Sequence, residues 1–355
     1  MTVLRRISFW FPLLLAVSCG RSGLVDNVPA EYVVPEKTVS LDPEFRFAAA
    51  EVLRCCGIQL VGDSLLVLQD RPSEDSPWYF KAYSTVSFDY IGSFVRYGRG
   101  PGEMLSPHIA KISSGGSCLV LNDNPLGKAY MVDVPGSIAS KKMSVMRTMA
   151  LPAGVVDWIP SSGPVQFALL SENGKTVFRT FGDDGVLNTF RTDDSVDGER
   201  YVTWMSSFLA SGGNNGKVAV AMIFFPLVNI FDTVGGHVRT IVTDRNFRGC
   251  SPENGGLVDM NSVQYHEGIS ASSEYVFATY KELPLGRLND AGEGSSIHVF
   301  DWDGNFICEV RVAENIGDIA YDSRSGRMYC IDKSGEGGVV CYDLGGVLPS
   351  EGSRR

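Results

Sequence analysis

The segment HVFDWDG, residues 298–304, joins an alternating apolar strand to an aspartate and a glycine, and the chain carries six copies of this pattern. The other five are FDYIG (88–92), MVDVPG (131–136), RTFGDDG (179–185), NIFDTVGG (229–236) and VCYDLGG (340–346). Each copy predicts a β-hairpin whose glycine supplies the positive φ of a tight turn. Successive copies lie 41 to 68 residues apart. A period in the forties with four strands per unit is typical of a propeller blade.

A second apolar strand precedes each hairpin at a similar distance. These strands are SLLVLQD (64–70), CLVLND (118–123), VQFALLSE (165–172), VAVAMIFF (218–225), EYVFATYK (274–281) and RMYCIDK (327–333). Their apolar density indicates central strands that are buried on both faces. The repeats therefore predict an all-β fold, a six-bladed β-propeller of four-stranded antiparallel blades.

The last blade lacks an obvious outer strand, because only residues 347–355 follow the last copy of the pattern. Near the N-terminus YVVPEKTVSL, residues 32–41, is strand-like and belongs to no blade. We expect it to complete the last blade and close the ring, which would remove two free sheet edges. The alternative is that residues 32–41 form an extended tail.

The N-terminus has the layout of a secretory signal peptide. Arg5 and Arg6 precede an apolar run at 7–17, which is too short for a stable membrane anchor. The run ends in LAVSC, residues 15–19, which resembles the bacterial lipobox. We therefore predict a lipoprotein signal peptide at 1–18, a lipidation site at Cys19, a tether at 19–31 and a propeller at 32–355. The alternatives are an ordinary secreted protein and a short buried helix.

The charge of the chain limits its partners. The formal net charge is −10, and loss of Arg5 and Arg6 with the signal peptide makes it −12. Nucleic acid and anionic lipid headgroups both require a basic face on the protein. We therefore expect no nucleic-acid partner, and contact with the membrane only through the lipid.

The stretch FDYIGSFVRYGRGPGE, residues 88–103, resembles the hairpin and G-x-G-P-G-E loop of the TolB-like six-bladed β-propeller lipoproteins of Bacteroidetes. The segments IHVFDWDGNFICEV (297–310) and IGDIAYDSRSGRMYCIDKSGEGGVVCYDL (316–344) resemble the same family. The resemblance implies a fold and a cell-envelope location, and it implies no particular chemistry. Surface-bound lipoproteins of these bacteria usually carry acids just after the lipidated cysteine, whereas residues 20–23 are GRSG. We therefore expect an outer-membrane lipoprotein on the periplasmic side.

The loop Gly98–Glu103 has two interpretations. A phosphate-binding loop is not supported, because Glu103 and Met104 stand where a Walker motif requires Lys followed by Ser or Thr. In the structural interpretation the glycines allow a sharp turn, Pro101 stiffens it, and Glu103 accepts hydrogen bonds from amides of the turn itself. In the functional interpretation Arg99 and Glu103 face the central opening and form a ligand loop.

Signals for catalysis are few. The four histidines show no metal-ligand spacing, and no serine lies in a G-x-S-x-G motif. We predict a binding module without catalytic residues or cofactor, whose ligand is an unknown protein, peptide or glycan. The alternative is a metal-dependent, calcium-type lactonase- or lyase-like enzyme with its site at the central channel. Asp70, Asp123 and Asp157 stand near strand ends and are the candidates for its acidic ligands.

Seven cysteines follow Cys19, and an odd number cannot all pair. Several lie in strands expected to be buried, where a free thiol acts as a small apolar side chain. If a turn at 334–337 closes a hairpin, Cys330 and Cys341 stand directly opposite each other, within disulfide range. The sequence leaves a disulfide and two free thiols as alternatives.

Overall fold

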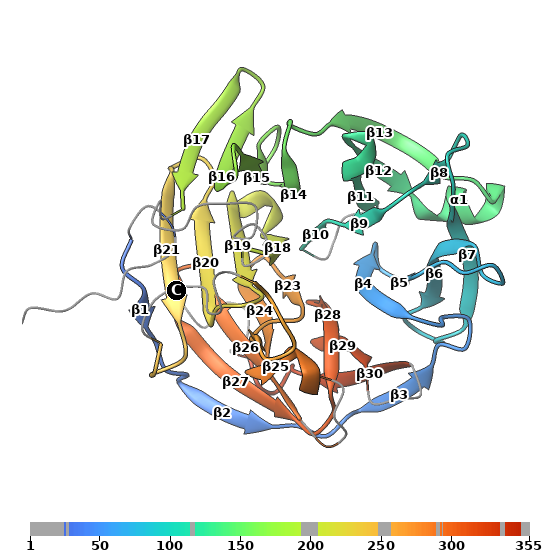
Figure 1. The fold of residues 1–355 in the computed structure, drawn as a ribbon. Coiled ribbons are helices and arrows are strands. Elements are labelled where there is room, and N and C mark those ends of the chain that lie inside the picture. Colours follow the sequence, from blue (N-terminus) through green and yellow to red (C-terminus); the bar gives the residue numbers. More distant parts are fainter. Residues whose placement is uncertain are drawn as a thin grey trace, which may run out of the picture.

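The repeated hairpins form six sheets of four or more strands that stand around a common axis (Figure 1). The structure is a computed structural model. It describes residue 25 and residues 28–113, 118–192, 205–247, 257–288, 292, 294–333 and 338–348. The predicted fold, an all-β six-bladed propeller closed by an N-terminal strand, is confirmed.

The first three blades follow one another along the chain, each from an inner strand to an outer strand. Blade 1 contains β4 (Cys55–Val61), β5 (Leu65–Asp70), β6 (Trp78–Ser84) and β7 (Tyr90–Tyr97), with the short β8 (Glu103–Met104) outside β7. Blade 2 contains β9 (Pro107–Ile109), β11 (Leu119–Asp123), β12 (Lys128–Asp133) and β13 (Ser144–Ala150). Blade 3 contains β14 (Val155–Pro160), β15 (Gln166–Glu172), β16 (Lys175–Gly182) and β17 (Gly185–Arg191).

The other three blades recruit strands from the N-terminus. Blade 4 contains β18 (Ser207–Ser211), β19 (Lys217–Met222), β20 (Leu227–Asp232) and β21 (His237–Val242), with β1 (Glu31–Tyr32) outside. Blade 5 contains β23 (Ile269–Ala271), β24 (Tyr275–Tyr280), β26 (Ser295–Asp301) and β27 (Phe306–Val312), with β2 (Lys37–Ser40) outside. Blade 6 contains β28 (Ile316–Asp322), β29 (Arg327–Asp332), β30 (Gly338–Asp343) and β3 (Phe45–Ala48). A small pair, β22 (Val263–Gln264) and β25 (Leu283–Pro284), lies outside the blades.

The apolar core lies between the blades. Every residue of β11 and of β28 is buried, as expected for strands packed between two neighbouring blades. One cluster joins blade 6 to blade 1, where Tyr329 and Cys341 pack with Leu66 and Tyr83. Each blade thus buries its faces against its neighbours, and the ring is the smallest unit in which all of them are covered.

The N-terminal segment 28–48, which we call the belt, runs along the outer edges of blades 4, 5 and 6 (Figure 1). β1 and β2 pair in parallel with β21 and β27, and β3 pairs antiparallel with β30. The closing strand is therefore 45–48, and the prediction that 32–41 closes the last blade is wrong. Phe45 and Phe47 explain the difference, because they pack against the ring of Phe88 in blade 1 at centroid distances of 4.4 and 5.2 Å. Ordered contacts begin even earlier, within the predicted tether, where buried Val25 forms an isolated bridge with Thr192.

The second copy of the repeat does not form a tight hairpin. Asp133 begins helix α1 (Val134–Ser140), and its carboxylate accepts the amide hydrogen of Gly136 at 3.2 Å. Ile138 of this helix packs so closely on β7 that a Cβ on Gly92 would lie 2.5 Å from it. Gly92 is therefore required for packing, whereas Gly304 supplies the positive φ (+83°) expected of a hairpin glycine. No helix in the described ranges is long and apolar enough to cross a membrane.

The inner strand of blade 2 continues into the middle of the ring. After β9 the chain forms β10 (Lys111–Ile112), which pairs in parallel with β18 of blade 4 rather than with its own blade. Ser113 continues this pairing, and its amide hydrogen is donated to the carbonyl oxygen of Ser211 at 2.9 Å. β10 therefore occupies part of the central channel (Figure 1).

Candidate functional site

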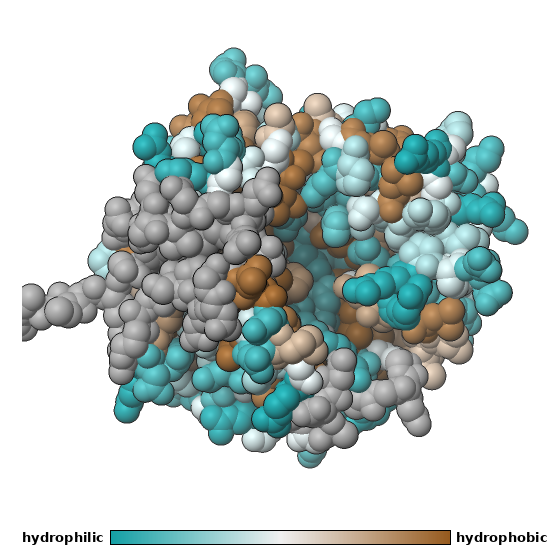
Figure 2. Space-filling view, viewed as in Figure 1, coloured by the Kyte–Doolittle hydropathy of each residue, from teal (hydrophilic) through white to brown (hydrophobic). Residues whose placement is uncertain are grey.

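A cavity of about 270 Å³ lies in the central channel, between the inner strands of blades 1 to 4 and β28. Its polar lining residues are Cys56, Gln69, His108, Lys111, Asp157, Ser206, Ser207 and Asp318. The face drawn in Figure 2 is hollowed near the middle of the ring, with hydrophilic side chains in the depth of the hollow. The cavity thus combines apolar walls with a few polar groups, which is the usual composition of a small-molecule site.

Lys111 holds the inner strands of three blades together at one side of the cavity. Its ammonium group lies 2.6 Å from the carboxylate of Asp318 and donates to the carbonyl oxygens of Ile58 and Ile319. Asp318 also accepts the amide hydrogens of Ile58 and Ile319, at 3.0 and 2.9 Å. Burial raises the pKa of Asp318, and the ammonium group of Lys111 opposes the shift. Both charges are thus matched by each other and by backbone groups.

Asp157 faces the same cavity but has no cationic partner among the described residues. Its Oδ1 accepts the amide hydrogen of Trp158 at 2.7 Å and, at 3.4 Å, a hydrogen of the Asn122 side chain. Burial raises the pKa of Asp157 to about 6, against these two hydrogen bonds, which lower it. The carboxyl group is surrounded by protein yet partly accessible, because it lines the cavity. No ion pair in the described part of the chain involves Asp157.

Two further polar groups line the cavity beside Asp157. The Ser207 hydroxyl is sealed from solvent and finds no hydrogen-bond partner among the described residues. His108 is exposed toward the cavity, and burial lowers its pKa, although the carboxylate of Asp123 opposes the shift. At neutral pH the imidazole is therefore uncharged and can accept a hydrogen bond.

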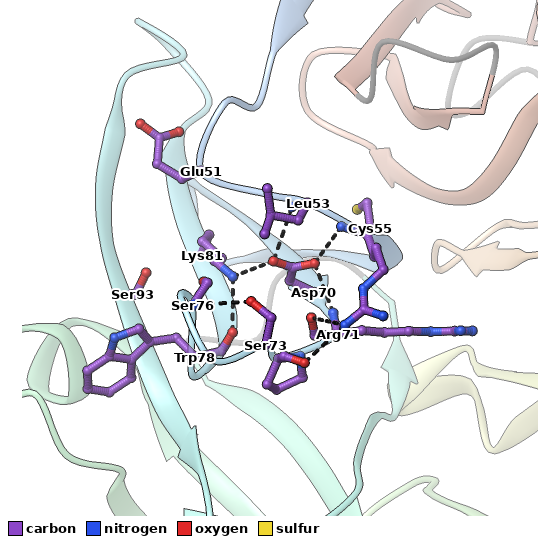
Figure 3. A network of polar contacts seen from close by, with 12 residues as sticks. Glu51, Leu53, Cys55, Asp70, Arg71, Ser73, Ser76, Trp78, Lys81 and Ser93 are labelled. Atoms are coloured by element: carbon purple, nitrogen blue, oxygen red, sulfur yellow. Dashed lines mark hydrogen bonds and ion pairs between the residues drawn. The ribbon is translucent and has the colours of Figure 1, made fainter.

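The three acids predicted as calcium ligands do not form a ring. Asp70 is fully buried, forms an ion pair with Lys81 at 2.6 Å, and accepts the amide hydrogens of Leu53 and Arg54 (Figure 3). Asp123 accepts the amide hydrogen of Leu105, on the opposite side of blade 2 from Asp157. Across the described ranges no three His, Cys, Asp or Glu side chains converge as a metal site would require. A calcium-dependent lactonase or lyase activity stays a prediction without support from these positions.

The loop Gly98–Glu103 lies at the outer edge of blade 1. β8 pairs in parallel with Arg96 and Tyr97 of β7, the outermost full strand of this blade. The Gly100 amide hydrogen is donated to the Glu103 carboxylate at 2.7 Å, and the Glu103 amide hydrogen to the Gly100 carbonyl at 3.0 Å. Glu103 is thus an acceptor within its own turn, as the structural interpretation predicts, and the loop does not face the central opening.

A groove of about 660 Å³ adjoins this loop on the side of blade 2. Beyond the loop, it is lined by Leu105, Pro125, Leu126, Tyr130, Met143 and Val145. A ligand role for Arg99 and Glu103 stays a prediction, and it now concerns the outer surface rather than the channel.

The cysteine pair of blade 6 does not stand in register. Cys330 lies opposite Val340, and Cys341 lies opposite Tyr329, so the predicted register is wrong by one residue. The turn 334–337, from which it was predicted, lies outside the described residues, as do Cys19 and Cys250. Successive strand residues point to opposite faces, so Cys330 and Cys341 point away from each other and both are free.

Two residues of the cavity, Lys111 and Asp318, were missed at the level of sequence. Each is a charge between apolar residues of a short strand, in HIAKI (108–112) and IGDIAYD (316–322). A buried charge in such a position needs a partner, so each of these residues could have been predicted from the sequence to form a buried ion pair. Lys111 and Asp318 are 207 positions apart along the chain, and they meet only because β10 crosses the channel.

No protein-family model and no curated protein matches the sequence. Solved structures match the fold. A member of the DUF4221 family from Bacteroides vulgatus superposes with a TM-score of 0.52 at 11% identity, covering 85% of this chain and 97% of the other. A Bacteroides fragilis protein whose name marks it as a candidate for export gives a TM-score of 0.51 at 10% identity, covering 87% and 98%. At these identities the likeness establishes the propeller fold and nothing finer.

Proposed function

We propose that this chain is a lipid-anchored propeller of the bacterial cell envelope that binds a small ligand in its central channel. The observation that carries the binding function is Asp157, a carboxyl group that lines the channel cavity and has no cationic partner. An uncompensated carboxyl group in a cavity is costly for folding alone, and a ligand offsets that cost. The protein acts as a binding module, and its own residues carry no assigned chemistry.

The envelope location rests on the N-terminal sequence. The run at 7–17 followed by LAVSC at 15–19 supports export and lipidation of Cys19. The name of the Bacteroides fragilis structural neighbour agrees with export, and the loop at 98–103 supports a place among the TolB-like propeller lipoproteins. GRSG at 20–23 favours the periplasmic side of the outer membrane.

Anchoring is tested by Cys19→Ser. This variant should leave the membrane fraction and lose fatty-acid labelling, while Cys56→Ser, a change in an exposed cysteine of the folded domain, should keep both. A Cys19→Ser protein that stays in the membrane fraction and takes up label would refute the anchor.

Ligand binding in the channel is tested through Cys56, which is exposed and lines the cavity, so a bound ligand should slow its alkylation by iodoacetamide. Glycans, peptides and small polar compounds are screened for slower alkylation of Cys56, followed by mass spectrometry. Ser207→Trp, which fills the cavity, should abolish binding of each hit, and Ser87→Trp in the exposed β6–β7 turn should not. Hits that bind the Ser207→Trp protein normally would place the site elsewhere.

A further inference from the structure

The charges around the channel cavity are uneven. Lys111 is matched by Asp318 at 2.6 Å, so that pair contributes no net charge. Burial lowers the pKa of His108 and raises the pKa of Cys56, which leaves both groups neutral near pH 7. Asp157 therefore gives the cavity a net negative charge at neutral pH, because burial raises its pKa only to about 6.

Charges just outside the cavity do not reverse this balance. The carboxylate of Asp123 raises the pKa of His108 against the effect of burial, and no ion pair in the described ranges involves Asp123. Arg71 contacts the thiol of Cys56 but does not line the cavity. The local field therefore favours a cation at the Asp157 end of the cavity.

We infer that the ligand is a small molecule with a primary ammonium group, held at the carboxylate of Asp157. This inference rests on the proposed binding function and adds the chemical class of the ligand. Oδ1 of Asp157 is engaged by Trp158 and Asn122, whereas Oδ2 has no partner within the described chain and is not sealed from the cavity. Oδ2 is therefore the acceptor available for a charge-assisted hydrogen bond.

The other acceptors of the cavity suit an ammonium group better than a metal ion. An ammonium group donates three hydrogen bonds, and the neutral imidazole of His108 lines the same cavity as Asp157, whereas the Ser207 hydroxyl is sealed from it. A divalent cation such as calcium needs six or more oxygen ligands, and no group of three suitable side chains forms among the described residues.

The size of the cavity limits the rest of the ligand. Its volume of about 270 Å³ lies just below the range of about 300–1,000 Å³ that holds drug-sized ligands. Apolar groups including Ile109, Val156 and Leu209 line the remaining wall. The ligand is therefore a compact amine, such as a short amino alcohol or one amino sugar, rather than a chain.

The test uses ligand pairs that differ only in this group. Ethanolamine is compared with ethylene glycol, and glucosamine with glucose, by titrating the full chain in detergent and following heat and Cys56 alkylation. The ammonium member of at least one pair should bind 10-fold or more tightly than its hydroxyl partner. Equal affinity within both pairs would overturn the ammonium inference, while slower Cys56 alkylation by both members would still support the binding function.

Substitution then assigns the contact. Asp157→Asn keeps the size of the side chain and removes its charge, so it should weaken amine binding at least 10-fold and leave the hydroxyl partner unchanged. Asp184→Asn, in the exposed turn between β16 and β17, is the matched control and should change neither. Unchanged amine affinity in Asp157→Asn, or no binding of either amine to the unmodified chain, would overturn the inference. The ligand pairs decide the question alone if the variant fails to fold.

Discussion

Blades 4 to 6 and blades 1 to 3 belong to one ring, but their outer edges are finished differently. The belt covers the first group with β1, β2 and β3, whereas β8 covers only two residues of blade 1. Blades 2 and 3 end in β13 and β17, where Met146 and Val186 are 60% and 54% exposed. Unpaired edges invite association with other chains, so the belt protects blades 4 and 5 with an extra strand and completes blade 6, whereas blades 2 and 3 end in their own outer strands.

The belt and blade 1 also place their charges differently. The belt is fastened by surface ion pairs such as Glu31–Arg239 at 2.8 Å and Arg46–Asp332 at 3.0 Å. Blade 1 instead buries a complete pair, Asp70–Lys81. Exposed pairs contribute little to stability, whereas breaking a buried pair leaves an unmatched charge in the core. We therefore expect the belt to owe its hold to strand pairing and to Phe45 and Phe47 rather than to charge.

The largest effect should come from truncating the belt at two points. A chain that starts at residue 49 loses β3, so blade 6 keeps three strands and an open edge, and we expect aggregation and no cooperative unfolding transition. A chain that starts at residue 42 loses only the extra strands β1 and β2, and its free energy of unfolding should fall by about 2–4 kcal/mol. Identical melting of the two chains would show that β3 does not close the ring.

The next effect should come from Lys81→Met in blade 1. This change leaves the Asp70 carboxylate buried with backbone donors alone, and the free energy of unfolding should fall by about 3–5 kcal/mol. Arg239→Met, which breaks the belt pair with Glu31, should cost about 1 kcal/mol or less. Denaturant titration of both proteins at pH 7 makes the comparison, and equal losses would contradict it.

Acid should change the free energy of unfolding in opposite directions through the buried histidines and through Asp157. His266 packs against β24 of blade 5, and His298 lies in β26 of the same blade. Burial lowers the pKa of His266 to about 4 and that of His298 to about 3, so the unfolded chain binds more protons below pH 6.5. Between pH 7 and 5, His266 alone should lower the free energy of unfolding by about 2 kcal/mol. In blade 3, Asp157 with its pKa of about 6 takes up a proton in the folded state first, which should add back about 1 kcal/mol.

Two variants separate these contributions. His266→Gln should flatten the fall in stability between pH 7 and 5, and Asp157→Asn should steepen it. Denaturant titrations at both pH values measure the slopes, and a steeper fall in His266→Gln would contradict the sign given for the histidine.

The last comparison concerns the loop that covers the edge of blade 1. Gly102 has φ +81°, and a Cβ there would meet nothing closer than 3.4 Å, so Gly102→Val should cost about 1–3 kcal/mol through backbone strain alone. Glu103→Ala removes one hydrogen bond to Gly100 and should cost about 1 kcal/mol. Arg99→Ala should leave the melting temperature unchanged. A larger loss of stability in Arg99→Ala than in Gly102→Val would contradict the structural interpretation of the loop.

The ring could be predicted from sequence because its units repeat. The six apolar strands are local signals, and each lies in a different blade, although only Gly185, Gly236 and Gly304 of the six repeat glycines have the expected positive φ. The closing strand was misplaced because FRFA at 45–48 is short and pairs with a strand almost 300 positions away. Its register depends on pairing with β30 and on packing against Phe88, and the N-terminal sequence alone predicts neither contact.

The cavity was predictable only in part. Asp157 stands out as a charge in an apolar strand, and it does line the channel. Asp70 and Asp123 carry the same local signal, but neither lines the cavity: Asp70 pairs with Lys81, and Asp123 accepts the amide hydrogen of Leu105 with one oxygen while its other oxygen is buried without a partner among the described residues. The crossing of β10 from blade 2 to blade 4 decides which charges meet, and a crossing between non-neighbouring blades has no periodic signature.

The belt also sets the order in which the molecule can be completed. Lys37 donates to the carbonyl oxygen of Val347, 310 positions later, and Glu44 meets Arg327, 283 positions later. The belt is synthesised well before these partners and must therefore wait for them, and such long-range closure is slow. During that interval the edges of β21, β27 and β30 stand open to the belt of any neighbouring copy. We expect refolding at high protein concentration to yield belt-exchanged dimers, in which each ring is closed by the other chain's N-terminus.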